Sequence, residues 1–263
     1  EFITSSIASL SQKDYLETIE TRNRLQKGRM IRLRQVFTNV SLLNTAIEDY
    51  DEELFSPNTE IERIIHNYEN LEKPGKLTKL IESIDTHMHR KEKVVVWTNF
   101  VKNVKYIQSE LQKKGIICEK IIGETPTDTK NKGKENGLTR SQIVEDFNDI
   151  DGNIQVIVAN PAACAESISL HKHCNNAIYY DLSYNTAQYL QSLDRIHRVG
   201  ASRSDPSFYY ILNYSLTVEY DIRERVNMKA ERMKAIMDTD YAVYELDIKD
   251  SRIENDIYKK IIN

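Results

Sequence analysis

The sequence predicts an α/β fold in which helices cover both faces of a parallel sheet. Between residues 76 and 214, helical patterns alternate with short apolar runs. Two of these runs, residues 94–98 and 154–159, are rich in β-branched residues and nearly continuous. Such runs are typical of strands that are buried on both faces of a sheet. Strands that alternate with helices indicate βαβ units and therefore a parallel sheet.

The expected elements follow one another in a simple order. Helices are predicted at residues 77–89, 101–114, 140–148, 188–200 and 217–237, and strands at 94–98, 116–122, 154–159, 177–181 and 208–212. Gly115 is expected to end the second helix, and Gly200 the fourth. Residues 125–138 contain almost no apolar residue and are predicted to form an exposed loop insertion.

Three regions are expected along the chain. Residues 1–72 are polar, contain a single glycine and carry apolar residues at helical intervals, so they predict a helical N-terminal extension. Residues 73–237 form the α/β domain. Residues 238–263 are charged and weakly patterned, and are interpreted as a tail. Because the sequence begins without methionine, we expect it to be part of a longer protein.

Composition narrows the possible functions. The net charge of −4 argues against a surface that is basic all round, so contacts with nucleic acid must be local. The three cysteines, Cys118, Cys164 and Cys174, form no paired motif, which predicts a reducing compartment, cytoplasmic or, in a eukaryote, nuclear. No apolar run approaches the roughly 20 residues of a membrane span. His171 and His173 lie beside Cys174, but their spacing suits no tetrahedral site, and no metal ion is predicted.

Residues 188–200 carry the most informative pattern. Arg195 and Arg198 are three residues apart, and Gln191 lies one turn earlier, so a helix would place all three on one face. Arginine forms forked contacts with phosphate oxygens, so this face is a candidate phosphate contact. An ordinary solvated helix face is the alternative, with Arg195 in an ion pair with Asp194 or Asp181.

This segment resembles motif VI of Swi/Snf-type ATPases, a family of superfamily-two helicases whose pattern is close to Q-x-x-D-R-x-H-R-x-G-Q. The matching residues are Gln191, Asp194, Arg195, His197, Arg198 and Gly200. Ala201 stands where the family has its final glutamine.

Further segments resemble the same family and occur in its order. Residues 32–43 are similar to its L-R-Q-x-x-x-H-P-x-L-L helix, 73–77 to S-x-K-L, 94–100 to motif IV (V-V-V-F-S-x-F), 156–170 to motif V (S-T-x-A-G-G-x-G-I-N-L) and 217–219 to T-V-E. In motif V, Cys164, Ala165 and Ser167 replace glycines, and Ser169 replaces the asparagine. The resemblance covers about residues 30–237.

The resemblance implies a RecA-like three-layer lobe that takes part in ATP hydrolysis. A complete motor of this family has two such lobes, with ATP and Mg²⁺ held mainly by the first. No GxxxxGKS/T phosphate loop occurs here, so the chain is interpreted as the second lobe alone. By resemblance, Arg198 and Arg195 are arginine fingers, and Gln191 orients the attacking water or contacts the γ-phosphate. Glu166 and Ser167 of motif V contact the nucleotide.

The resemblance also implies partners. Double-stranded DNA would run across both lobes, with Thr98, Asn99, Ser167 and Ser169 contacting its phosphates. The first lobe is the expected partner, residues 1–72 brace the connection to it, and the helical extensions offer a surface for a further protein. The function implied is the second motor lobe of an ATP-dependent double-stranded DNA translocase, inactive when isolated.

Two alternatives stay open. The chain could be a lobe of a strand-separating DNA or RNA helicase, although the H-R-x-G core and the T-V-E segment favour the Swi/Snf type. It could also be a non-catalytic module that docks a partner, which the substitutions in motif V would allow. The retained Gln191, Arg195 and Arg198 argue against that second alternative.

Overall fold

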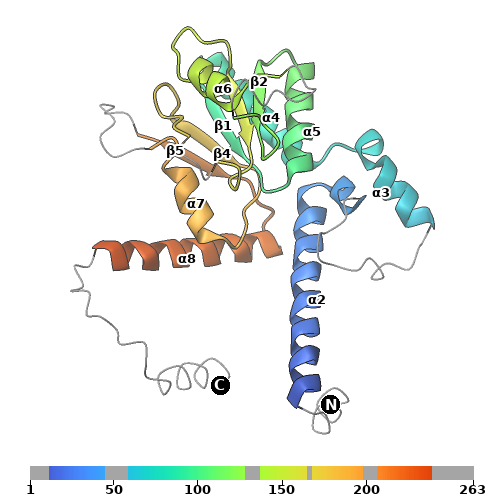
Figure 1. Cartoon of the computed structure of the whole chain (residues 1–263). Helices are drawn as coiled ribbons and strands as arrows, with labels where there is room; N and C mark the ends of the chain where they lie inside the picture. The colour runs from blue at the N-terminus through green and yellow to red at the C-terminus, as the bar shows by residue number, and fades with distance from the viewer. Residues whose placement is uncertain (1–11, 45–58, 128–136, 165–167, 198–205, 239–263) are drawn as a thin grey trace.

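A parallel sheet forms the centre of the molecule, as the computed structural model shows for residues 12–44, 59–127, 137–164, 168–197 and 206–238 (Figure 1). Five strands lie in the order β2-β3-β1-β4-β5, and every neighbouring pair is parallel. The strands are β1 Val94–Trp97, β2 Cys118–Ile121, β3 Val156–Ala159, β4 Asn176–Tyr179 and β5 Phe208–Ile211. The predicted α/β class, its parallel sheet and the five predicted strands are therefore confirmed.

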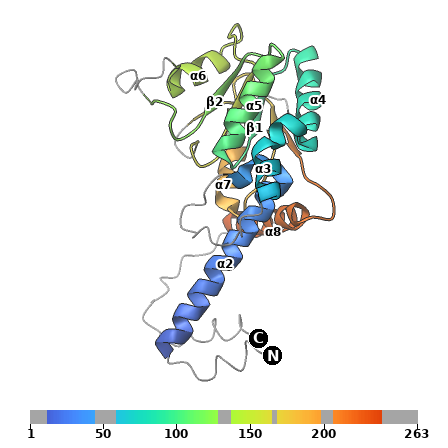
Figure 2. The same ribbon diagram turned by 90° about the vertical axis from the view of Figure 1, so that its right-hand side faces the viewer.

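Helices cover both faces of this sheet. On one face lie α4 (Gly75–His89) and α5 (Val101–Lys113), and on the other α6 (Arg140–Phe147) and α7 (Thr186–Leu193) (Figure 2). Side chains alternate along β1, so Val94 and Val96 join the α4/α5 core while Val95 and Trp97 join the α6/α7 core. All four are completely buried, which explains the continuous apolar run.

Local sequence sets several helix ends. Thr139 begins α6 with a capping box, in which its hydroxyl accepts from the Gln142 amide and the Gln142 side chain accepts from the Thr139 amide. Gly115 follows the end of α5, as predicted, and has a left-handed backbone conformation with φ 79°. Glycine adopts this conformation without strain because it has no Cβ atom.

The helix of motif VI differs from its prediction. The pattern placed one helix over residues 188–200 with Gly200 at its end, but α7 begins at Thr186 and ends at Leu193. The Asn185 side chain caps its first turn by accepting from the Gln188 amide. Asp194 is the C-terminal cap, so Arg195 lies in a turn beyond the helix. The prediction that one helix carries Gln191 and Arg195 was wrong.

Four further elements of the described chain lie outside the sheet and its covering helices. A long helix, α2 (Gln12–Thr38), projects away from the lobe, and a short 3₁₀ helix (Val40–Asn44) follows it (Figure 1). The helix α3 (Thr59–Leu71) packs against that 3₁₀ helix. At the other end of the described chain, α8 (Val218–Asp238) crosses below α7 and touches α2.

Some expectations fall on residues that the structure does not describe. Residues 128–136 of the loop insertion and residues 239–263 of the tail lie outside the described part of the chain. Within the described residues, no helix combines the length and apolar character that crossing a membrane requires.

The turn after α6 generates a stability prediction. A Cβ atom added to Gly152 would lie 1.8 Å from the backbone carbonyl oxygen of Asp146. At that distance the two atoms overlap, so the backbone has to shift. We expect Gly152→Ala to lower the free energy of unfolding by about 1–3 kcal/mol, the usual range for overpacking. Gly123→Ala is the matched control, because its Cβ would meet nothing within 4 Å. Equal thermal unfolding midpoints for the two variants would contradict the expectation.

Candidate functional site

The site begins at the carboxyl ends of the central strands. Asp181, which follows β4, is buried and receives a hydrogen bond from the hydroxyl of Thr98, directly after β1. The same carboxylate accepts from the backbone N–H of Asn99 at 3.0 Å and from its Nδ2 at 2.8 Å. A buried carboxylate requires such donors. Thr98 is itself completely buried, so its hydroxyl supports Asp181 in this conformation.

A second contact fixes Asn99 from the other side. Asn160, which follows β3, donates from Nδ2 to the Asn99 carbonyl at 2.8 Å and accepts from the Ala162 amide at 2.9 Å. The chain leaves β1 toward the α4/α5 face, whereas Cys164 and Leu170, beyond β3, pack in the core of the α6/α7 face. Ligands of open α/β sheets bind where neighbouring strands diverge in this way. Asn99 lies at that point.

Arg140, at the start of α6, fixes the loops that follow β2 and β3. Its guanidinium donates to the carbonyls of Thr125 at 3.1 Å, Ala163 at 3.2 Å and Ile122 at 3.0 Å. A longer contact of 3.3 Å reaches Gly123. The sequence did not reveal this role, because the carbonyls lie on two separate loops and backbone acceptors leave no signature in a residue pattern.

The helix α2 reaches the same carboxylate. The Arg34 guanidinium lies 5.2 Å from the centre of the Phe100 ring, and its Nη2 lies 3.8 Å from the Asp181 carboxylate. Tyr180 adds a hydrogen bond of 3.3 Å from its hydroxyl to the Thr38 carbonyl. The segment that resembles the family's L-R-Q helix is therefore attached to motif IV.

A buried ion pair joins two other motifs. Lys76, from the S-x-K-L-like segment, donates to the carboxylate of Glu219 from the T-V-E segment and to the Tyr180 carbonyl at 3.0 Å. Glu219 also accepts from the backbone N–H of Tyr214 at 3.1 Å. Burial lowers the pKa of the Lys76 ammonium, and the charge of Glu219 opposes that change. The sequence indicated both motifs but not their pairing.

Motif VI is fastened to motif V. Arg195 donates from Nη1 to the carbonyl of Ile168 at 3.2 Å, and its own carbonyl accepts from the Leu170 amide at 2.8 Å. Gln191 and His197 are exposed on the same segment, on either side of Arg195. The candidate residues Arg198, Glu166 and Ser167 lie outside the described residues.

The predicted nucleic-acid residues do not all lie together. The Ser169 hydroxyl forms a 2.7 Å hydrogen bond with His171 Nδ1, and the Ser169 carbonyl accepts from Asn148 at 2.6 Å. Asn148 caps the end of α6. Lys93, which lies just before β1, donates to the Phe147 carbonyl in the same turn at 2.9 Å. Ser169 is therefore near the amino ends of the strands, whereas Thr98 and Asn99 are at the carboxyl ends.

Cys118 and Cys164 have no catalytic environment. Burial raises the pKa of the Cys118 thiol to about 12 and that of the Cys164 thiol also to about 12. A thiol with such a pKa carries almost no nucleophilic thiolate at neutral pH. Among the residues with described positions, no group of three or more histidine, cysteine, aspartate or glutamate side chains is arranged to hold a metal ion.

Comparisons with known proteins agree with this geometry. Residues 72–200 match the family described as the helicase conserved C-terminal domain. Over 220 residues the chain is 27% identical to the ATP-dependent helicase rhp16 of Schizosaccharomyces pombe, covering 81% of this chain and 23% of that protein. It is 28% identical over 131 residues to the SNF2 domain-containing protein CLASSY 4 of Arabidopsis thaliana, covering 50% of this chain and 11% of that protein.

The fold and these matches define a C-terminal helicase lobe of the RecA-like α/β class. More particularly, the similarity to Swi/Snf-type relatives such as CLASSY 4 supports the predicted family resemblance. The chain spans no more than a quarter of the length of the two relatives described above. Among solved structures, it is also similar to the C-terminal part of the Fun30 ATPase domain, at 20% identity and a TM-score of 0.49, covering 73% of this chain and 65% of that one.

The buried Lys76–Glu219 pair generates the second prediction. Lys76→Met leaves the Glu219 carboxylate buried without its cation, so we expect the free energy of unfolding to fall by about 3–5 kcal/mol. Lys79→Met is the matched control, because Lys79 forms an exposed ion pair with Glu82 three residues away. That pair is worth less than about 1 kcal/mol. Urea unfolding measures the free energy of unfolding of both variants. Equal losses of stability in the two variants would show that Lys76 and Glu219 are not coupled in the core.

Proposed function

We propose that this helicase-family motor lobe is the second lobe of an ATP-dependent translocase that moves along double-stranded DNA. The observation that carries the proposal is the attachment of motif VI to motif V through Arg195, Ile168 and Leu170. This attachment places a segment with exposed Gln191 in a fixed position beside the motif V loop. A phosphate-facing surface that completes a neighbouring nucleotide site requires such a fixed position.

The nucleotide chemistry is divided between lobes in this proposal. The sequence has no GxxxxGKS/T phosphate loop, so ATP and Mg²⁺ belong mainly to the first lobe. When bound there, ATP supplies the γ-phosphoryl group and Mg²⁺ neutralises its charge. Arg198 reaches across the cleft and stabilises the transition-state charge, and Gln191 orients the attacking water. Glu166 and Ser167 contact the nucleotide from motif V.

Arg195 has a more specific role in the proposal. Its bond to the Ile168 carbonyl holds the turn after α7 against the motif V loop. We propose that Arg195 positions motif VI, whereas Arg198 supplies most of the charge neutralisation.

The arrangement of the sheet suggests the path of the DNA across the lobe, which we call the DNA track. Asn99 lies at the carboxyl ends of the central strands and lines the proposed track there, with its backbone N–H and Nδ2 donating to Asp181. Ser167 is the contact proposed on motif V, whereas Ser169 lies near the amino ends of the strands and away from Asn99. Contacts of this kind position a duplex without reading its sequence, and they tolerate the modest net charge of the chain. The proposal places the protein in the cytoplasm or, in a eukaryote, in the nucleus.

The first functional prediction concerns the chain alone. With the triphosphate site on another lobe, the 263 residues are expected to hydrolyse ATP no faster than buffer, with or without duplex DNA. A phosphate-release assay measures this. Robust turnover that survives repurification would overturn the one-lobe interpretation.

The second functional prediction concerns a protein that joins this chain to a first lobe. Arg198→Ala is expected to lower DNA-stimulated ATP hydrolysis by about 10³-fold or more, the contribution of an arginine finger, with little change in duplex affinity. Arg90→Ala is the control, because Arg90 is an exposed cap at the far end of α4. Unchanged turnover in Arg198→Ala would favour the non-catalytic docking module. Stronger stimulation by single strands or RNA than by duplex DNA would favour the strand-separating helicase.

A further inference from the structure

The helix α2 extends well beyond the body of the lobe. Its C-terminal part is attached through Arg34 and Thr38, but its N-terminal part projects away from the carboxyl ends of the strands (Figures 1 and 2). From residue 20 to 27, every side chain whose burial is described is exposed. Most of the stability of helices in proteins comes from tertiary packing, so a helix that projects in this way needs a further source of stability.

Residues 22–34 of α2, which follow the acidic residues Asp14, Glu17 and Glu20 of the same helix, carry an unusual concentration of positive charge. Between Arg22 and Arg34 there are six basic residues and no carboxylate, although the whole chain has a net charge of −4. Four of the six are exposed: Arg22, Arg24, Lys27 and Arg29. Within the described parts of the chain, no carboxylate lies within ion-pair distance of these four. They repel one another across adjacent turns, a cost that a polyanion would remove.

The residue types favour the phosphate backbone of a duplex as the polyanion. Protein interfaces need an apolar centre, but Leu25 is the only large apolar residue from 21 to 29. Single strands are held by aromatic side chains that stack on bases, and residues 21–29 contain none. Arginine and lysine without apolar or aromatic anchors are typical of contacts that neutralise phosphates.

The direction of the helix agrees with this choice. Lys27 lies two turns before Arg34 and on the same side of α2, and Arg24 lies one turn before Lys27. Arg34 reaches Asp181 at the carboxyl ends of the strands, where Asn99 is held. The side of α2 that carries Lys27 therefore faces the same way as the loops of the proposed DNA track.

We propose that the projecting part of α2, residues 22–29, is a second phosphate-binding surface that grips the duplex beside the lobe, with Arg24 and Lys27 making the contacts. This inference rests on the proposed function and adds to it a binding surface outside the helicase motifs. Since Arg34 and Asp181 connect α2 to Asn99, the duplex is held at two points of one rigid unit. Binding at α2 is sequence-independent and weakens as salt is added.

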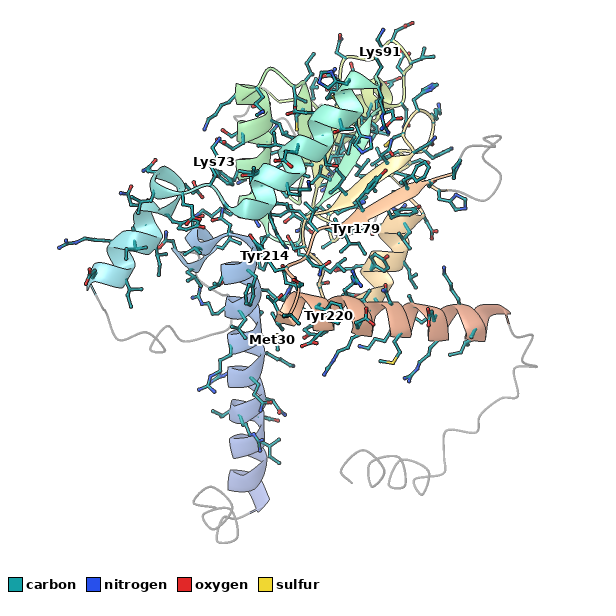
Figure 3. The ribbon with its side chains drawn as sticks, turned by 180° about the vertical axis from the view of Figure 1, so that it is seen from behind. Met30, Lys73, Lys91, Tyr179, Tyr214 and Tyr220 are labelled. Carbon is teal, nitrogen blue, oxygen red and sulfur yellow. The ribbon has the colours of Figure 1, made fainter. Side chains whose placement is uncertain are left out.

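The test compares two variants with the same change in charge. In one, Arg24→Gln and Lys27→Gln remove two cations from α2. In the control, Arg90→Gln and Lys91→Gln remove two exposed cations at the opposite end of the molecule, as the labels of Met30 and Lys91 show in Figure 3. Far-UV circular dichroism checks that both variants keep their helices. Fluorescence anisotropy of a labelled duplex is then measured between about 50 and 200 mM salt.

The α2 variant is expected to bind duplex on the order of tenfold more weakly at the lower salt concentration. Its slope of log affinity against log salt is expected to be smaller by about 1.8, because each lost phosphate contact removes about 0.9. The control is expected to bind like the unmodified chain. Equal losses in the two variants would overturn the inference, because a general charge effect would then explain both.

A third variant separates this inference from the proposed function. Asn99→Ala alters the track on the lobe and keeps every basic residue of α2. If the unmodified chain binds no duplex at all, the proposed DNA function fails. If Asn99→Ala weakens binding while the α2 variant does not, the track is right and the inference about α2 is wrong. If the α2 variant binds duplex normally but loses affinity for the first lobe, the surface belongs to a protein interface, and the inference is again overturned.

Discussion

The arrangement of the site depends on one buried charge, the Asp181 carboxylate. A carboxylate is costly to remove from water, and the cost is met here by donors from β1 and a nearby guanidinium from α2. The donors lie on the segment after β1, the guanidinium lies on α2 and the carboxylate follows β4, so one charge relates the positions of three segments. Asn99 is presented at the end of the sheet because Asp181 holds both its backbone and its side chain.

A second buried pair performs the same task near Asp181. Lys76 and Glu219 join the start of α4 to the start of α8, and Lys76 also donates to the Tyr180 carbonyl. Tyr180 and Asp181 are adjacent in sequence, so the two ion pairs share one short stretch of chain after β4. Family motifs far apart in the sequence are in this way structural partners, and several of them stabilise the lobe instead of touching a ligand.

Much of this structure could be predicted from the sequence, and the failures have physical causes. The buried strands were evident because every side chain of β1 and β3 is enclosed by two cores, which leaves a continuous apolar signature. The end of α7 was missed because a long-range contact decides it: the Arg195 carbonyl accepts from Leu170 in place of a partner in its own helix. The role of Arg140 was missed for a similar reason, since its acceptors are backbone carbonyls on loops that only the folded sheet brings together.

The Lys76–Glu219 pair also constrains when the lobe can mature during synthesis. The two residues are 143 positions apart, and the contact between Tyr180 and Thr38 spans 142. Until Glu219 has left the ribosome, the Lys76 ammonium has no carboxylate to accompany it into the interior, and a growing chain that closes early would bury that charge alone. Consolidation of the core therefore waits for the beginning of α8, and a nascent chain halted before that helix exposes surface that chaperones recognise.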